Sequence, residues 1–143
     1  MPISDAERDQ RRALLDAHYD PENDHDLDRI METFSNEAEM IYNGQAFRDH
    51  DGIRAAHVYL GMSSTRGAFR GVQHVRDRVH VTDDEIVVEG RLCGTHVGEF
   101  QGFPPTNRDV ELPFIAFYRF DEDQKLASER VVMDLGSLGV RDS

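Results

Sequence analysis

Several residue types that point to particular kinds of protein are scarce in this 143-residue chain. Cys93 is the only cysteine, which excludes an internal disulfide and a metal site built from a cysteine cluster. The chain has no run of about 18 apolar residues, so the sequence predicts no membrane span. It also lacks a glycine-rich phosphate loop and a dinucleotide fingerprint, so nothing indicates a nucleotide cofactor.

Positive charge is scarce as well. The formal net charge is -12 at pH 7, and Lys125 is the only lysine beside fifteen arginines. A surface this acidic repels the phosphates of nucleic acids and of anionic membranes, so we expect neither as a partner. The first residues are polar and charged, so we expect no signal peptide and a cytoplasmic location.

The length fits a single domain over residues 1–143. A capping box at Ser4 predicts the start of a first helix, which runs to about His18 and ends before Pro21. A second predicted helix carries apolar residues at helical spacing over residues 27–34. A short strand over 37–43 and a third helix over 51–60 follow.

From Val72 onward apolar residues alternate with polar ones, a pattern typical of strands. The predicted strands cover residues 72–81, 85–100, 110–120 and 126–134. Helices followed by a long antiparallel meander predict an α+β fold. We expect a cone-shaped, strongly curved antiparallel sheet with the N-terminal helices over its concave face, and a pocket inside the cone.

The chain is organised around residues 94–108, where a strand ends and a stiff turn begins. His96 is the only ionisable residue on its face of the strand, and Pro104 and Pro105 restrict the turn that follows. Three glycines lie along the same face: Gly90, Gly94 and Gly98. Strand interiors normally avoid glycine, so this spacing predicts a bend, a bulge or a ligand close to the backbone.

This stretch resembles the SnoaL-like polyketide cyclases and the related ester cyclases of the nuclear transport factor 2-like superfamily. Their pattern reads roughly G-T-H-x-G-x-x-x-G-x-P-P-T-G-R-x-V. It is matched here by Gly94-Thr95-His96, Gly98, Gly102, Pro104-Pro105-Thr106, Arg108 and Val110. Asn107 stands where the family usually has glycine, a mild departure because asparagine tolerates the same backbone conformation. The resemblance covers residues 47–140 and implies a cystatin-like α+β barrel.

The resemblance also implies a cofactor-free acid/base enzyme that performs aldol-type chemistry on a small hydrophobic carbonyl compound. Asp134 is the predicted base, because an aspartate at this place is the acid/base in similar polyketide cyclases. His96 is the predicted donor to the developing oxyanion, in a hydrogen-bonded pair with Asp134. Burial in an apolar cavity would raise the pKa of such a carboxyl toward neutrality.

The residues themselves leave an alternative open for Asp134. Its carboxylate could instead be solvated, or accept N–H groups from the turn at 135–136. Strict alternation in the last strand groups Asp134 with Arg130 and Val132, and Glu129 with Val131 and Met133. Which group faces inward depends on a register that a bulge would reverse.

Further predicted substrate-binding residues are Tyr42, His57, Tyr59, Phe114 and Tyr19, with core packing as the alternative for each. The seven histidines show no spacing that resembles a known zinc site, so we expect no metal and no cofactor.

Two other functions remain open for this fold. It could serve as a non-catalytic small-molecule-binding module or as a protein-interaction module. Epoxide hydrolysis would need an Asp-Arg-Asp constellation, and the spacing around Arg91 and Arg119 gives it no support. Strands 72–81 and 85–100 carry apolar residues on both faces, and helices cover only one. We therefore expect a homodimer or higher homo-oligomer.

Overall fold

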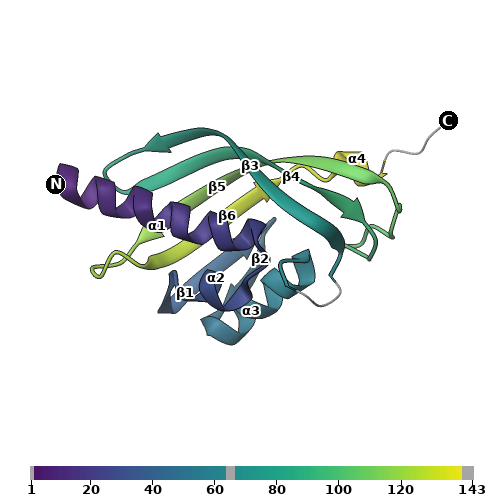
Figure 1. Ribbon diagram of the computed structural model, residues 1–143, viewed down its shortest axis with the longest axis horizontal. Coiled ribbons are helices and arrows are strands. Elements are labelled where there is room, and N and C mark those ends of the chain that lie inside the picture. The colour runs from purple at the N-terminus through teal and green to yellow at the C-terminus, as the bar shows by residue number, and fades with distance from the viewer. Residues whose placement is uncertain (1, 64–66, 140–143) are drawn as a thin grey trace.

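The computed structural model describes residues 2–63 and 67–139 as one curved sheet with helices on one side (Figure 1). Its elements are α1 Asp5–Asn23, α2 Leu27–Met31, β1 Phe34–Tyr42, β2 Gln45–Arg48, α3 Asp49–Leu60, β3 Phe69–Val81, β4 Glu85–His96, β5 Asp109–Phe120, β6 Leu126–Met133 and α4 Gly136–Gly139. The six strands lie in the order β2-β1-β6-β5-β4-β3. The predicted α+β class, with N-terminal helices over a curved sheet, is confirmed.

Strands β3 to β6 form the antiparallel meander that the sequence predicts. Strand β1 was expected only as a short strand, and it pairs in parallel with β6, with Met40 opposite Glu129 and Tyr42 opposite Val131. The sheet stays open, because β2 and β3 are its two edges. The parallel pair therefore brings the first and last strands of the chain together inside the sheet, next to the edge strand β2.

Helix α1 is longer than the sequence predicts. Ser4 caps it as expected, since its hydroxyl accepts the Glu7 N–H at 3.1 Å. The predicted end before Pro21 is wrong, because the helix continues to Asn23. Proline removes a backbone donor and crowds the preceding turn, but here it stands in the last turn, where little helix follows it. The added residues place Glu22 on the buried side of the helix, four positions after His18.

The second helix is shorter than predicted, because it ends at Met31. Asp26 caps α2, and its carboxylate accepts the Arg29 N–H at 3.3 Å. The predicted apolar stripe ran on to Phe34, but Phe34 begins β1 instead. Ile30, Met31 and Phe34 are all buried, so their spacing reflects a shared core and not a single helix.

The core lies between the helices and the concave face of the sheet, and one side of β4 points into it. The buried positions of that strand are Ile86, Val88, Gly90, Leu92 and His96, the stripe that the sequence predicts. A Cβ on Gly90 would stand 2.4 Å from the carbonyl oxygen of Val75 and 2.7 Å from the ring of Phe114. Strand β3 is irregular opposite this point, between Arg76 and Arg78. The glycine thus allows a close approach of the two strands beside a bulge.

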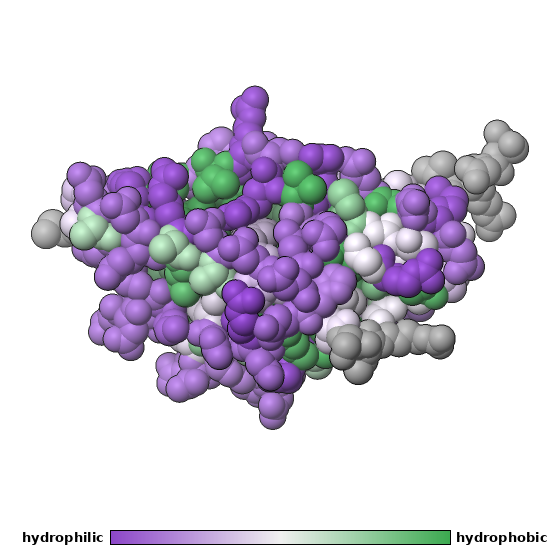
Figure 2. All heavy atoms as spheres, viewed as in Figure 1, coloured by the Kyte–Doolittle hydropathy of each residue, from purple (hydrophilic) through white to green (hydrophobic). Residues whose placement is uncertain are grey.

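The visible surface is largely hydrophilic, with hydrophobic side chains in scattered patches (Figure 2). This fits the formal charge of -12. Among residues 2–63 and 67–139, none of the helices combines the length and the apolar character that a membrane crossing requires.

We expect Gly90→Ala to lower the free energy of unfolding by roughly 1–3 kcal/mol, as overpacking of a tight core does. Gly52→Ala in α3 is the matched control, because its Cβ would meet nothing closer than 3.7 Å. The control should raise stability by about 0.5–1 kcal/mol through reduced freedom of the unfolded chain. Urea denaturation measures both values, and equal effects would contradict the steric role of Gly90.

Candidate active site

The structure places the two predicted catalytic residues on opposite faces of the sheet. Asp134 follows β6 on the outer face, where its side chain is exposed and accepts the Gly136 N–H at 2.8 Å. His96 is buried on the inner face at the end of β4. The predicted hydrogen-bonded pair is therefore not formed, and Asp134 adopts the alternative of accepting from the turn that follows it.

Hydrogen bonds from His96 hold the turn at residues 104–108 against the end of β4. Its Nδ1 accepts the Thr106 N–H at 3.2 Å, and its backbone bonds to Arg108 and Asn107 at 2.9 and 2.8 Å. The imidazole packs on Phe69, with ring centroids 5.3 Å apart. Burial lowers the pKa of His96, and the nearby Arg108 guanidinium adds to this effect. Asn107 has the left-handed conformation, φ 56°, that the sequence suggested it would tolerate.

The structure shows which residues of β6 face the core. Glu129, Val131 and Met133 are buried on the inner face, while Val132 and Asp134 are exposed on the outer face. The inward group borders a cavity of about 20 Å³ between the helices and the sheet. Its lining residues are Tyr19, Glu22, Met40, Tyr42, Met62, His74, Phe114, Tyr118, Glu129, Val131 and Met133.

The five predicted substrate-binding residues lie in or near this region. Tyr19, Tyr42 and Phe114 line the cavity itself. Tyr59 lines a neighbouring space of about 10 Å³ together with Tyr42, and its hydroxyl donates to Glu99 at 3.0 Å. His57 is fully buried and contacts the carboxylate of Glu22, one of the cavity residues.

Two carboxylates and three imidazoles meet beside the cavity, and we call them the buried cluster. Glu22 Oε2 lies 3.5 Å from His18 Nε2 and 3.4 Å from His57 Nε2, and Glu22 Oε1 lies 4.0 Å from His74 Nδ1. Glu129 Oε1 lies 3.2 Å from His18 Nε2. Helices α1 and α3 and strands β3 and β6 supply these side chains. In the described part of the chain, every ion-pair partner of Glu22 is an imidazole.

The cluster shifts the pKa of three residues: Glu22, His57 and His74. Burial raises the pKa of Glu22, but His18, His74 and His57 together outweigh burial and lower it to about 2. Burial lowers the pKa of His57, yet its contact with Glu22 outweighs this and raises the pKa overall. The pKa of His74 is lowered, mainly by burial. Glu22 is consequently a carboxylate at neutral pH, and His74 is a neutral imidazole.

A hydrogen-bonded tyrosine pair stands next to the buried cluster. The hydroxyl oxygens of Tyr19 and Tyr118 are 2.6 Å apart, and both residues line the cavity. Burial raises both pKa values well above the ordinary range, so the phenols keep their protons. One proton is used between them, which leaves the other for a further acceptor. Tyr118 lies directly opposite Glu129 across β5 and β6.

The Glu129 carboxylate has one oxygen that makes no hydrogen bond to the described residues. Glu129 Oε2 is buried without a hydrogen-bond partner among the described residues. Buried polar atoms are normally bonded, and an exception often marks a functional group. A carboxylate oxygen and a phenol donor thus face the same small space.

The sequence analysis did not assign roles to four of these residues, namely His18, Glu22, Glu129 and Tyr118. The i, i+4 spacing of His18 and Glu22 was visible, but the helix was expected to end before Pro21. Glu129 was left as one of two alternatives in the last strand. Its inward direction and the pairing with Tyr118 depend on register, which the chain alone does not specify.

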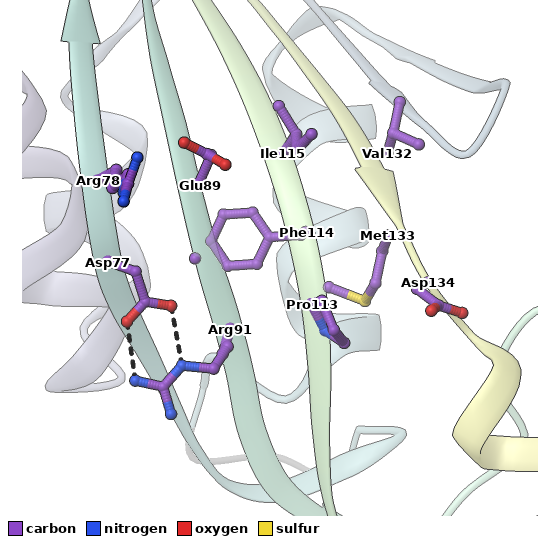
Figure 3. A pocket seen from close by; sticks show the side chains of 11 residues that line it. Asp77, Arg78, Glu89, Arg91, Pro113, Phe114, Ile115, Val132, Met133 and Asp134 are labelled. Carbon is purple, nitrogen blue, oxygen red and sulfur yellow. Dashed lines mark hydrogen bonds and ion pairs between the residues drawn. The ribbon is translucent and has the colours of Figure 1, made fainter.

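The outer face of the sheet carries a groove of about 580 Å³ (Figure 3). Its residues come from β3 to β6, with Asp134 just past the end of β6. Asp77 and Arg91 form a two-bond ion pair there, with both contacts at 2.9 Å. Ile115 and Val132 in the same groove are 41% and 54% exposed, which is high for large apolar side chains.

Comparisons with known proteins support the fold and the family. A family model described as the SnoaL-like domain matches residues 15–129. No curated protein sequence matches the chain. Among solved structures, a SnoaL-like polyketide cyclase from Jannaschia sp. CCS1 is similar, with a TM-score of 0.78 and 23% identity over 96% of this chain and 94% of that one.

Two other solved structures extend the comparison. SalBIII, an epoxide hydrolase/cyclase-like enzyme in pyran ring formation of the polyether salinomycin, gives a TM-score of 0.74 and 15% identity over 90% of this chain and 93% of that one. A protein of ketosteroid isomerase-like fold from Catenulispora acidiphila, in complex with trimethylamine, gives a TM-score of 0.70 and 12% identity over 87% of this chain and 88% of that one. At these identities the likeness shows the fold.

We expect His96→Gln to make the folded protein less sensitive to acid. The folded-state pKa of His96 lies below the unfolded value of about 6.5. The unfolded chain therefore binds more protons as the pH falls through this range, and the wild type loses stability. Glutamine keeps an acceptor for Thr106 but does not titrate. Urea denaturation from about pH 5 to about pH 8 measures the free energy of unfolding of both proteins, and this free energy should fall less in the variant than in the wild type toward acid pH. A constant difference would contradict this.

Proposed function

The chain belongs to the SnoaL-like domain family, and on that premise we propose that it is an acid/base catalyst of the polyketide-cyclase type. Its substrate would be a small hydrophobic carbonyl compound held between the helices and the sheet. The observation that carries the proposal is the buried Glu129 carboxylate, which has an uncommitted oxygen and lines the same cavity as Tyr118. The similar fold of a SnoaL-like polyketide cyclase and of a ring-forming cyclase-like enzyme supports the reaction type.

An aldol-type ring closure needs a base and a donor in one place. Glu129 Oε2 takes the proton from the carbon beside a carbonyl, and the pair Tyr118–Tyr19 donates a hydrogen bond to the enolate oxygen that forms. The enolate carbon then attacks a second carbonyl of the same substrate and forms the new carbon–carbon bond. The proton held by Glu129 passes to the resulting alkoxide, so the enzyme returns to its starting state. These steps need no organic cofactor.

Glu22 is less suited to be the base. Its three imidazole neighbours lower its pKa to about 2, so its carboxylate accepts a proton poorly. Its contact with His18, which also touches Glu129, makes it a positioning residue for the base.

The cavity must widen to admit a substrate. A volume of about 20 Å³ holds roughly one water molecule. Three methionines line it: Met40, Met62 and Met133. Methionine is unbranched and adapts its shape readily, so changes of rotamer can enlarge the space while the sheet stays in place.

The first test compares the two candidate bases. We expect Glu129→Gln to lower kcat by about 10²–10⁴-fold on a panel of β-dicarbonyl and polyketide-like esters, because the amide keeps the shape and loses the proton acceptor. Asp134→Asn is the matched control, and we expect it to retain most of the rate. Activity lost in Asp134→Asn and kept in Glu129→Gln would instead identify Asp134, the residue that the sequence predicts.

The second candidate function is binding without chemistry, favoured by the small, mostly apolar cavity. If no ester of the panel is turned over and several raise the melting temperature, the protein is a small-molecule-binding module. In that case Glu129→Gln should bind these compounds almost as well as the wild type does.

We also propose that two copies associate through the outer groove. Ile115 and Val132 are exposed on this face, and apolar surface of this kind commonly marks an interface. Light scattering at micromolar concentration should show a dimer or larger homo-oligomer. Val132→Glu should dissociate it, whereas Ala13→Glu, which adds the same charge to an exposed position of α1, should not. A monomeric wild type would contradict the proposal.

A further inference from the structure

Three ligand-type atoms converge inside the buried cluster. His18 Nε2, Glu22 Oε2 and His57 Nε2 all lie within 4.8 Å of one another, and all three residues are buried. The carboxylate oxygen is 3.5 Å from the first imidazole and 3.4 Å from the second. Atoms bound at about 2.0–2.1 Å to a tetrahedral zinc ion stand about 3.4 Å from each other. The spacing thus matches that of ligands around one shared ion.

The hydrogen bonds behind the two imidazoles fix where their protons are. Thr33 Oγ1 donates its single proton to the Ile30 carbonyl at 2.6 Å, so it accepts from His18 Nδ1–H at 2.9 Å. His57 Nδ1 lies 2.8 Å from the Ile53 carbonyl, which can only accept. Both rings therefore carry a proton on Nδ1. In the neutral form, each presents a bare lone pair at Nε2, whereas in the charged form His18 Nε2–H donates to Glu129 Oε1 at 3.2 Å.

Both Nε2 atoms lie within 3.5 Å of the same Glu22 oxygen, which is itself electron-rich. A carboxylate oxygen facing two unprotonated ring nitrogens is unfavourable, and it needs either a proton on each nitrogen or a cation in the middle. His57 Nε2 has no hydrogen-bond partner among the described residues, although Glu22 Oε2 is only 3.4 Å away. A shared cation would satisfy all three atoms at once.

We propose that His18, Glu22 and His57 bind a divalent transition-metal ion. Two imidazoles and one carboxylate form the donor set of catalytic zinc sites and of non-haem iron(II) sites. Glu129 Oε1, at 3.2 Å from His18 Nε2, stands beside the remaining coordination position. Glu22 and Glu129 also line the cavity of about 20 Å³, which has room for roughly one water molecule.

The contacts behind the ligands fit the same role. Metal-binding histidines usually donate their other ring N–H to a backbone carbonyl or another fixed acceptor, which orients the ring. The Ile53 carbonyl and the Thr33 hydroxyl supply such acceptors here. The expectation of no metal was based on spacing along the chain. That spacing shows His18 and Glu22 in one helix, but not His57, which α3 brings to them.

The test measures metal binding directly and needs no substrate. Protein stripped with a chelator is titrated with Zn²⁺ and, separately, with Co²⁺, whose visible absorption reports the ligand geometry. We expect one ion per chain and a higher melting temperature. Glu22→Gln and His57→Gln should each weaken binding by at least about 100-fold, beyond the loss caused by removing an outer contact. His96→Gln, a change at a buried histidine outside the cluster, should bind as the wild type does.

Two results would overturn the proposal. One is a wild type that binds neither ion stoichiometrically. The other is binding that persists in both ligand variants, because the ions would then sit on the acidic surface. If a ligand variant fails to fold, Thr33→Val replaces it, since this change removes no ligand atom, only the acceptor of His18 Nδ1–H and the bond from the same hydroxyl to the Ile30 carbonyl. It should lower affinity by about 10–100-fold, and unchanged affinity counts against the site.

The metal proposal does not rest on the proposed cyclase activity. If the protein binds zinc but turns over no ester, the metal site is supported and the catalytic proposal is contradicted. If protein shown to bind no metal turns over an ester, the catalytic proposal is supported and the metal site is contradicted.

Discussion

The burial of the Glu22 carboxylate is the constraint on which the interior depends. A charged group in an apolar core is stable only with partners, and breaking a buried pair costs about 3–5 kcal/mol. Here the partners are imidazoles from α1, α3 and β3. Apolar packing alone would let these elements slide over the sheet. The directional contacts to one carboxylate fix where each helix sits, and with it the position of every side chain around the cavity.

The fold was largely predictable because its signals are local. Alternation in the long strands and the close approach at Gly90 are visible in short windows of sequence. The parallel pairing of β1 with β6 has no local signal, since it joins segments far apart in the chain. The end of α1 was predicted wrongly at Pro21 for a related reason. Proline opposes a helix interior, but how many residues follow it depends on packing of the last turn.

The site was harder to predict than the fold. A histidine among glycines on a bent strand suits a ligand pocket, but it equally suits the anchor of a turn, which is what His96 is. Asp134 and Glu129 differ by an odd number of positions, so a single register decides which one enters the core. The His18–Glu22–His57 group needs a helix–helix contact that no residue pattern along the chain describes.

The pairing of β1 with β6 also bears on how the protein forms as it leaves the ribosome. The cluster combines the first helix with the last long strand, and Glu129 is synthesised after almost every residue that it contacts. Until that strand is made, Met40 and Tyr42 have no neighbour on that side, and His18 lacks one of its two carboxylate partners. Contacts between distant segments are slow to form. The cluster is therefore complete only after β6 has been synthesised.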